Sequence, residues 1–592
     1  MDGQFLPIFK SDLKERGWKE LDIILISGDA YVDHPSYGPA IIGRVLEDAG
    51  FKVGLIAQPD WKSSEDFLKL GRPKLFFGVT AGNLDSILSN YTPYRKPRRK
   101  DYYSPGGKTG LRPNRATIVY ANKVREVFPD VPIVLGGLEA SLRRLAYYDF
   151  WSDEVRRSIL LDARGDILVY GMAERQVVEI ATRLKKGENI KNLDNIRGTA
   201  VIRSKAEGFR YFVVVPSFEE VKAGKDKFNE AFRIAYLEGD PFRGKTVIQK
   251  HGERFLIQFP PAYPLAPEEL DRVYGLNYER SWHPVYDREG GVPGFETVRF
   301  SITSHRGCCG ECSFCSLYAH QGRIIQSRSQ GSIIKEIKLL AEKKDFKGTI
   351  TDIGGPTANL YEARCESWIK KGACSDKKCL LPAKCKNLKL GYAETLILWK
   401  EGMAIPGVKR LFISSGLRYD LLTDKSSEEY LKNLCEFHIS GQLKVAPEHA
   451  VEAVLEVMNK PPLKAYEEFV EKFKKINKEL NKKQYLVNYF ISAHPGSDLK
   501  AALDMALYLV KGRIHPEQIQ DFMPLPMTVS GCIYYTGRHP FTGSEVYVSR
   551  SVKERKMQRA LMQYNQPENR KLILEALGRL NKLSLRKVII EK

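Results

Sequence analysis

Short, continuously apolar segments alternate with helical patterns along the first 200 residues, and this alternation constrains the fold more than any other feature of the sequence. Helical patterns occupy residues 37–49 and 116–128 and a segment ending at Leu184. Strands that are apolar on both faces belong to parallel sheets covered by helices on both sides. We therefore predict a doubly wound parallel-sheet α/β domain over residues 1–196, with ligand-carrying loops at the carboxyl ends of its strands. The predicted strands are residues 21–27, 52–56, 74–79, 132–135 and 166–169.

A second alternating region follows residues 197–292, a segment of short strand patterns and Pro-rich turns that we expect to link two domains. Six strand candidates separated by helical patterns predict a partial (β/α)6 TIM-type barrel over residues 293–550, with active-site residues at the carboxyl ends of its strands. The tail, residues 551–592, is basic and helical. The six candidates are residues 297–303, 347–353, 408–414, 443–446, 485–492 and 519–522.

The ten cysteines are unevenly distributed: eight lie between Cys308 and Cys385, and the first 307 residues contain none. A dense cysteine cluster inside a chain of 592 residues indicates metal or redox chemistry rather than a disulfide framework. The sequence has no apolar run of about 18 residues, and its first residues do not have the pattern of a signal peptide. We therefore expect a cytoplasmic protein with no membrane partner.

Positive charge is in excess, with 93 Lys and Arg against 72 Asp and Glu and a net charge of +21. Lys-rich solvated helices explain such a balance, and so does a polyanionic partner such as RNA. Residues 90–115 carry eight Lys and Arg with four interleaved tyrosines, a composition that suits phosphate contacts and base stacking. A solvated loop is the alternative interpretation of this segment.

The motif Cys308-x3-Cys312-x2-Cys315 directly follows the first predicted barrel strand. Three thiolates from one tight loop can hold a 4Fe–4S cluster and leave one iron open to a ligand. Three alternatives stay open on the residues alone: a zinc knuckle completed by His305 or His320, an electron-transfer cluster with a distant fourth cysteine, and a motif in which Cys309 replaces Cys308.

This spacing at the end of a first barrel strand resembles the radical S-adenosylmethionine (radical SAM) superfamily. The resemblance implies that SAM binds the open iron and that an electron from an external donor cleaves its sulfonium to a 5′-deoxyadenosyl radical. It also implies SAM-binding positions: an aromatic residue beside the adenine, a Gly-Gly turn whose backbone meets the SAM amino group, and side chains at the ends of the fourth and fifth strands. In this sequence these are Phe314, Gly354, Gly355, Glu448 and His494.

The resemblance extends over essentially the full chain to the YgiQ-type radical SAM proteins. It is carried by TSHRGCCGECSFCSLYAHQGRIIQSRS, DIGGPTANLY, SSGLRYD, KVAPEH and MPLPMTVSGCIYYTGRHPF. The N-terminal domain resembles the cobalamin-binding-like module that precedes many radical SAM barrels. Its loop over residues 33–38 lacks the spacing of a cobalt-ligating Asp-x-His-x-x-Gly motif, so a cap role for His34 is favoured over cobalt ligation. Cobalamin bound without a protein ligand and a domain that has lost the cofactor both stay open.

A second cysteine group follows the Gly-Gly turn, with four thiols within 21 residues among Lys and Asp side chains. We interpret it as a second metal centre, either iron–sulfur or structural zinc, because the irregular spacing does not choose between them. Its members are Cys365, Cys374, Cys379 and Cys385.

The sequence thus predicts a radical SAM enzyme that modifies an unidentified substrate, with RNA or another polyanion as the hypothesis that follows from charge. The alternative is a cluster-bearing redox-sensing or nucleic-acid-binding protein without SAM turnover.

Overall fold

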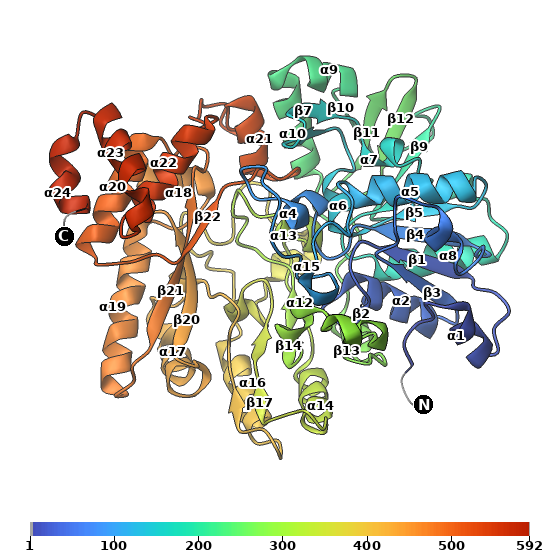
Figure 1. Ribbon diagram of the computed structural model, residues 1–592, viewed down its shortest axis with the longest axis horizontal. Coiled ribbons are helices and arrows are strands. Elements are labelled where there is room, and N and C mark those ends of the chain that lie inside the picture. The colour runs from blue at the N-terminus through green and yellow to red at the C-terminus, as the bar shows by residue number, and fades with distance from the viewer. Residues whose placement is uncertain (1–3, 591–592) are drawn as a thin grey trace. The chain divides into compact units, whose positions relative to one another are not determined.

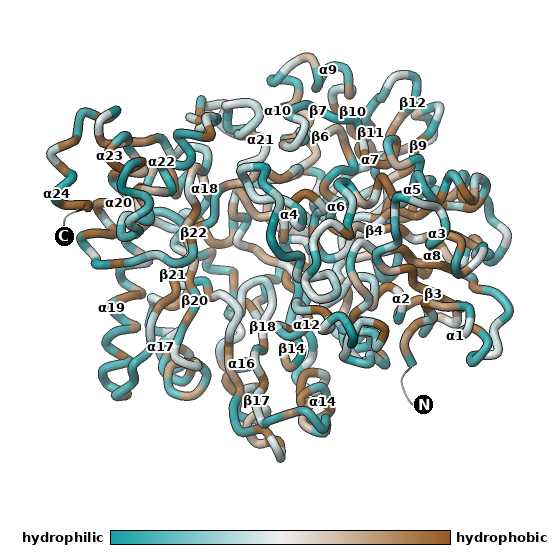
Figure 2. Tube along the Cα trace, in the orientation of Figure 1, coloured by the Kyte–Doolittle hydropathy of each residue, from teal (hydrophilic) through white to brown (hydrophobic). Residues whose placement is uncertain are grey.

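The computed structural model describes residues 4–590 (Figure 1). The brown, apolar stretches in Figure 2 include β3 (Val53–Ala57) and β4 (Phe76–Thr80), two of the segments expected to be buried strands. Across the described residues, no helix combines the length and apolarity needed to cross a membrane.

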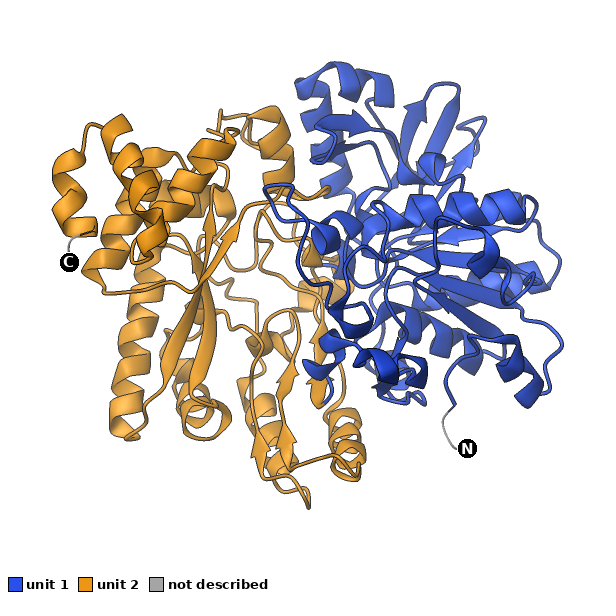
Figure 3. Ribbon diagram, in the orientation of Figure 1, with its two compact units in different colours: residues 1–299, 319–322 blue, residues 300–318, 323–592 orange. Residues whose placement is uncertain are grey.

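The chain divides into two compact units (Figure 3). Unit 1 comprises residues 1–299 and 319–322, and unit 2 comprises residues 300–318 and 323–592. Each unit has its own sheet system and its own apolar core.

Unit 1 is built on a nine-stranded sheet in the order β10-β11-β12-β9-β8-β5-β4-β1-β3. The five predicted strands are present and pair in parallel, with Ile23 of β1 opposite Val53 of β3 and Phe76 of β4. Their carboxyl ends therefore meet at one edge of the sheet, as expected. Besides β3 and β4 they are β1 (Ile23–Ser27), β5 (Ile133–Leu135) and β8 (Ile167–Val169).

Alternate side chains of these strands pack against different helices. Ile23, Leu25 and Val134 join a core with α2 (Gly38–Asp48) and α8 (Glu174–Lys185), which contact each other. On the strands' other side, Phe77 packs on Phe128 at the end of α5 (Ala116–Val127), with 5.3 Å between ring centroids. Both faces of the sheet are covered, which explains why the strand sequences are apolar throughout.

The sheet is mixed, in contrast to the wholly parallel sheet expected, and the segment at residues 197–292 supplies part of it. β9 was absent from the predicted strands; it pairs antiparallel with β8 and with β12. The hairpin of β11 and β12 turns at Gly252, whose φ of +59° favours glycine. The added strands are β9 (Thr199–Arg203), β10 (Phe212–Val215), β11 (Thr246–His251) and β12 (Arg254–Gln258).

Unit 2 contains parallel strand pairs that follow the chain in order. β14 pairs with β18, β17 with β19, β20 with β21, and β21 with β22, while a parallel bridge joins Leu417 to Val445. Every predicted barrel segment overlaps one or two of these strands. β20 is longer than its predicted segment, and the other strands are shorter than or close to the predicted length. They are β14 (Ser301–Thr303), β17 (Thr349–Ile350), β18 (Asp352–Gly354), β19 (Arg410–Leu411), β20 (Gln442–Glu448), β21 (Tyr485–Ser492) and β22 (Gln518–Asp521).

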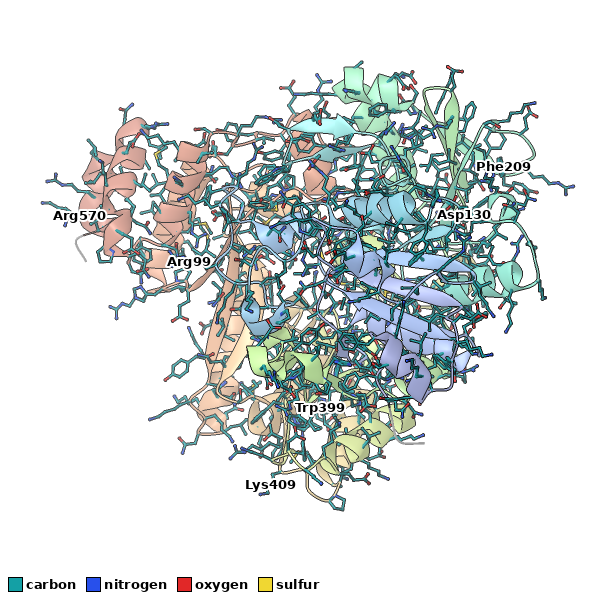
Figure 4. All side chains as sticks on the ribbon, turned by 45° about the vertical axis from the view of Figure 1, so that its right-hand side comes forward. Arg99, Asp130, Phe209, Trp399, Lys409 and Arg570 are labelled. Atoms are coloured by element: carbon teal, nitrogen blue, oxygen red, sulfur yellow. The ribbon has the colours of Figure 1, made fainter. Side chains whose placement is uncertain are left out.

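Helices between these strands complete the core of unit 2. Trp399 of α16 (Tyr392–Met403), marked in Figure 4, is 1% exposed and packs in one apolar cluster with Ile337 of α14 (Gln330–Ala341) and Phe469 of α19 (Leu463–Glu479). After Ser551 the described residues form α22 (Val552–Met562), α23 (Arg570–Arg579) and α24 (Arg586–Ile589), which pack with α20 (Leu499–Lys511).

Candidate functional site

The cysteines Cys308, Cys312 and Cys315 lie in the loop that leaves β14, the first strand of unit 2. A short antiparallel pair, β15 (His305–Arg306) with β16 (Gln326–Ser327), forms the entry to this loop. Gly307 follows with φ of +84°, a conformation that a side chain disfavours. The loop therefore begins from a defined position at the carboxyl end of the strand.

Partners distant in sequence fix the cysteine loop. The side-chain amide of Asn459 donates to the carbonyl oxygens of Gly310 and Glu311 at 3.2 and 2.8 Å. The N–H of Ser530 donates to the carbonyl oxygen of Ser313 at 2.8 Å. Sequence reasoning missed Asn459, because its left-handed φ of +53° after α18 (Glu452–Met458) indicates only a helix end.

The three thiols of the motif affect one another electrostatically. Burial, with a smaller contribution from negative charge on Cys312, raises the pKa of Cys308 to about 11 and that of Cys315 to about 12. Such coupling indicates that the sulfurs share a small volume, where bound cationic metal relieves the repulsion between thiolates. The donor set therefore fits an iron–sulfur cluster, whose irons are held by Cys thiolates.

A guanidinium lies against this loop. Nη1 of Arg418 donates to Sγ of Cys312 at 3.6 Å, although the two residues are 106 positions apart. Asp420 is the carboxylate partner of this guanidinium, and the contact with a motif sulfur has no signal in the sequence.

Across residues 4–590, no three His, Cys, Asp or Glu side chains converge closely enough to hold a single metal ion. A cubane cluster places its own iron and sulfide core between the thiolates, so its ligands stand farther apart than those of one ion. His305, a candidate fourth zinc ligand, is buried beside Ser304, with its Nδ1 2.9 Å from the serine Oγ.

The Gly-Gly turn ends β18 and packs directly against the start of the cysteine loop. The carbonyl oxygen of Gly354 accepts the N–H of Ser304 at 2.7 Å. A Cβ on Gly354 would lie 2.3 Å from Oγ of Ser415, and one on Gly355 would lie 2.6 Å from the ring of His305. Both glycines are therefore needed for this close backbone approach.

Phe314 and His494, predicted from separate motifs, are in contact. Their rings meet edge to face with centroids 5.9 Å apart. His494 is fully buried, its Nδ1 donates to the carbonyl oxygen of Pro495 at 2.7 Å, and its Nε2 accepts from Oγ of Ser530 at 2.7 Å. Burial lowers the pKa of His494 to about 3, so the imidazole is neutral at physiological pH.

Glu448 ends β20 with φ of +70°, a rare conformation for this residue type. Its Oε1 lies 3.9 Å from Nζ of Lys460, and both side chains are buried. Burial raises the pKa of Glu448 to about 7 against the opposing charges of Lys460 and Arg418. A carboxyl group of this kind can gain or lose a proton near neutrality. Lys460 was missed by sequence reasoning, since a single Lys before two prolines has no catalytic pattern.

His449 is structural. It is buried beside Glu448, its Nδ1 accepts the N–H of Val451 at 3.1 Å, and burial lowers its pKa to about 3.

Three members of the second cysteine group share one apolar cluster with Cys309. Cys365, Cys379 and Cys385 pack against this cluster, which contains Trp368 and Leu380, whereas Cys374 is not one of its members. Cys309 is 1% exposed, and its thiol hydrogen bonds with that of Cys379, which lowers the pKa of Cys379 and raises that of Cys309. Cys309 therefore contacts the second cysteine group, whereas Cys308, which packs against the same cluster, is also coupled electrostatically to Cys312 and Cys315.

In unit 1, His34 lies in a turn after β2 (Val32–Asp33) and is 1% exposed. Its Nδ1 accepts the N–H of Ser36 at 3.1 Å, and its ring packs edge-on to Phe295. These contacts fit a capping histidine and do not fit a cobalt ligand. In the same unit, Gly137 follows β5 with φ of +81°, and a Cβ at this position would collide with the Thr80 side chain of the adjacent strand β4.

Most cations of the basic segment, residues 90–115, have structural roles. Arg112 is fully buried and donates to Asp29 at 2.7 Å and Asp101 at 3.1 Å, which ties the segment to the carboxyl end of β1. Four further cations bind neighbouring carbonyl or carboxylate oxygens: Arg95, Arg98, Lys108 and Arg115. The other three, Lys96, Arg99 and Lys100, are exposed; Arg99 is marked in Figure 4.

Two family models match the sequence. The radical SAM N-terminal domain matches residues 5–301, and a domain of unknown function (DUF3362) matches residues 517–585. A UPF0313 protein of Clostridium botulinum (strain 657) is 52% identical over 573 residues, which cover 97% of this chain and 90% of the relative. A UPF0313 protein of Methanosarcina mazei is 52% identical over 609 residues, which cover 97% of each chain.

The solved structures that match this chain are less similar to it in sequence than these relatives are. The radical SAM methyltransferase TsrM of Kitasatospora setae, with cobalamin and a [4Fe-4S] cluster bound, gives a TM-score of 0.47 at 16% identity over 86% of this chain and 76% of that one. The cobalamin-dependent radical enzyme OxsB gives a TM-score of 0.48 at 10% identity over 96% of this chain and 63% of that one.

Proposed function

The chain belongs to the UPF0313 family of radical SAM enzymes, and from this premise we propose that Cys308, Cys312 and Cys315 hold a 4Fe–4S cluster at which SAM is reductively cleaved. When bound, such a cluster supplies the electron that converts SAM to methionine and a 5′-deoxyadenosyl radical. The observation that carries the proposal is the electrostatic coupling of three half-buried thiols in one loop at the carboxyl end of the first strand of unit 2.

The surrounding residues have distinct roles in this proposal. We infer that the parallel strands of unit 2 form a partial six-stranded barrel, because all their carboxyl ends then meet where the cysteine loop begins. Gly354 and Gly355 let the backbone approach the amino group of SAM. The Phe314 ring, held by His494, provides an apolar wall for the adenine. Glu448 takes up or releases a proton or receives a polar group of SAM or substrate.

A second metal centre at Cys365, Cys374, Cys379 and Cys385 is part of the same proposal. Its support is that three of these thiols pack on one apolar cluster, where a metal centre is shielded from water. An electron donor is required by the reductive chemistry, and a cluster close to the first one provides a route for that electron.

RNA is the substrate class that the charge of the chain favours. The exposed cations Lys96, Arg99 and Lys100 supply phosphate contacts in this interpretation, and methylation or methylthiolation would be the reaction. The same three residues on a solvated loop are also compatible with a protein that binds no polyanion, so binding to tRNA or rRNA at low salt tests the proposal. The cytoplasmic location stays a prediction.

The decisive experiment is anaerobic. The reconstituted protein receives dithionite and SAM, and 5′-deoxyadenosine is quantified against a Cys308→Ala control. We expect product from the native protein and none from the variant. A fully loaded native cluster that binds no SAM and yields no product would overturn the proposal in favour of the redox-sensing alternative.

A further inference from the structure

The guanidinium of Arg418 is shared between a carboxylate and a sulfur of the cysteine loop. Its Nε and Nη2 donate to the two carboxylate oxygens of Asp420 at 2.9 and 2.7 Å, and its Nη1 donates to Sγ of Cys312 at 3.6 Å. Because the fork with Asp420 fixes the guanidinium plane, the third nitrogen has one direction available to it. That direction leads to the sulfur.

The rest of the surroundings hold Arg418 in this orientation. The side-chain amide of Asn359 accepts from the N–H of Arg418 and donates to its carbonyl oxygen, both at 2.9 Å. Gly310 provides the space for the guanidinium, since a Cβ at this position would lie 2.8 Å from Nη1. The Arg418 side chain is only 6% exposed, so its charge is removed from water and poorly screened.

A buried cation beside a cluster ligand has a predictable effect on electron uptake. Reduction adds one negative charge, which is distributed over the irons and their sulfur ligands. A cation and a hydrogen bond at a ligand sulfur therefore stabilise the reduced state more than the oxidised state. Asp420 partly offsets this effect, but it lies on the far side of the guanidinium from the sulfur contact.

We propose that Arg418 is a positioning residue for the reduction step, and that its charge and its hydrogen bond to Cys312 raise the reduction potential of the cluster. This inference rests on the proposed function. The step it governs is the uptake of one electron by the oxidised cluster from a low-potential reductant, with no bond made or broken in the protein. Arg418 thereby sets how strong a reductant the enzyme needs before SAM is cleaved.

The test is a redox titration of the full-length, cluster-loaded protein with dithionite, followed by electron paramagnetic resonance and without SAM. Arg418→Gln removes the charge, and Arg418→Lys keeps a charge without the fork. The double variant Arg418→Gln with Asp420→Asn removes both charges of the buried pair and protects against misfolding caused by an unpaired Asp420. Arg410→Gln removes an exposed cation elsewhere in unit 2 and is the matched control.

We expect full iron loading in every variant. In Arg418→Gln the equilibrium between oxidised and reduced cluster shifts about tenfold toward the oxidised form, equivalent to ~59 mV for a one-electron couple. The double variant shifts in the same direction by less, Arg418→Lys lies between Arg418→Gln and the native protein, and Arg410→Gln stays at the native value.

An unchanged potential in iron-loaded Arg418→Gln would overturn the inference, and so would a loss of SAM affinity without a change in potential, since that result assigns Arg418 to the cofactor carboxylate. Absence of a cluster in the native protein is a different outcome, because it overturns the proposed function and the inference together. Iron content and the spectrum of the native protein therefore separate the two failures.

Discussion

The ring of His494 stands edge-on to the ring of Phe314, with 5.9 Å between the centroids and 83° between the planes. Phe314 lies between the last two cysteines of the motif, whereas His494 follows β21. Since both ring nitrogens of His494 are hydrogen bonded and its pKa is lowered to about 3 by burial, the histidine supports the aromatic ring without contributing charge.

Replacing His494 with Ala should destabilise the protein and loosen Phe314. The substitution leaves the Ser530 hydroxyl and the Pro495 carbonyl without these bonds and creates a cavity, which should lower the free energy of unfolding by about 2–4 kcal/mol. Urea denaturation at neutral pH measures this change. His515→Ala, at an exposed position, is the control and should have little effect. Equal stability of the two variants would contradict the assigned role.

Glu448 should make stability depend on pH in an unusual direction. Burial raises its folded-state pKa from 4.5 to about 7, so between these values the folded protein holds a proton that the unfolded chain has lost. The contribution of Glu448 to the free energy of unfolding is therefore fully present below pH 4.5 and is lost as the pH rises to about 7. The full decrease is roughly 3 kcal/mol.

Comparison with Glu448→Gln isolates this contribution from other titrating groups, since the amide does not ionise. The free energy of unfolding of the native protein should fall relative to that of Glu448→Gln as the pH rises from 4.5 to 7. A difference that is flat over this range would show that Glu448 is already ionised at the lower pH.

Prediction from sequence worked where the signal is local. The apolar strand around Ile24 is contained within a few residues and led to the correct element. The spacing of Cys308, Cys312 and Cys315 is equally local, and its assignment to a cluster stays a prediction. β9 was missed because Thr199–Arg203 is a short strand whose last two residues are only half-buried.

Residues that support the candidate site through long-range contacts could not be predicted in this way. Arg418 reaches Cys312 across 106 residues, and Asn459 reaches Gly310 across 149. Neither contact leaves a periodic or spaced pattern, because each depends on how separate strands are ordered around the cysteine loop. The pairing of Cys309 with Cys379 is similar, since sequence alone placed Cys309 as an alternative to Cys308.

The second cysteine group should contain metal that depends on Cys379. We expect Cys379→Ala to lose iron or zinc beyond the iron of the first cluster, as measured by elemental analysis of anaerobically purified protein. Cys435→Ala, which replaces a buried cysteine in a different apolar cluster of unit 2, is the matched control and should keep all its metal. Identical metal content in the two variants would exclude a second centre at this group.

Variants of Cys374 and Cys309 then identify the remaining ligand. Because Cys309 contacts Cys379 and Cys374 does not belong to the shared cluster, we expect Cys309→Ala to lose more of this metal than Cys374→Ala. The reverse order would assign the fourth position to Cys374.

The basic segment should bind polyanions through Lys96, Arg99 and Lys100, exposed cations outside the set whose hydrogen bonds hold Arg95, Arg98, Lys108 and Arg115. Replacing Lys96, Arg99 and Lys100 with Ser should weaken tRNA binding and reduce the slope of log affinity against log salt by about 2–3. The control replaces three exposed lysines of α19, Lys474, Lys475 and Lys478, and removes the same charge from another surface. Equal losses in both triple variants would indicate a non-specific effect of net charge.

Arg112 should stabilise unit 1 more than any exposed cation of the same segment. Arg112→Met leaves Asp29 and Asp101 buried without their shared guanidinium, and the pKa of Asp29 is already raised by burial. We expect the free energy of unfolding to fall by about 3–5 kcal/mol, the usual cost of breaking a buried pair by removing one partner. Arg72→Ala, which breaks the exposed pair with Asp130 marked in Figure 4, is the control and should cause no measurable change. If the two variants unfold at the same denaturant concentration, the buried triad does not anchor the basic segment to β1, and the ordered course of residues 90–115 must depend on its other contacts.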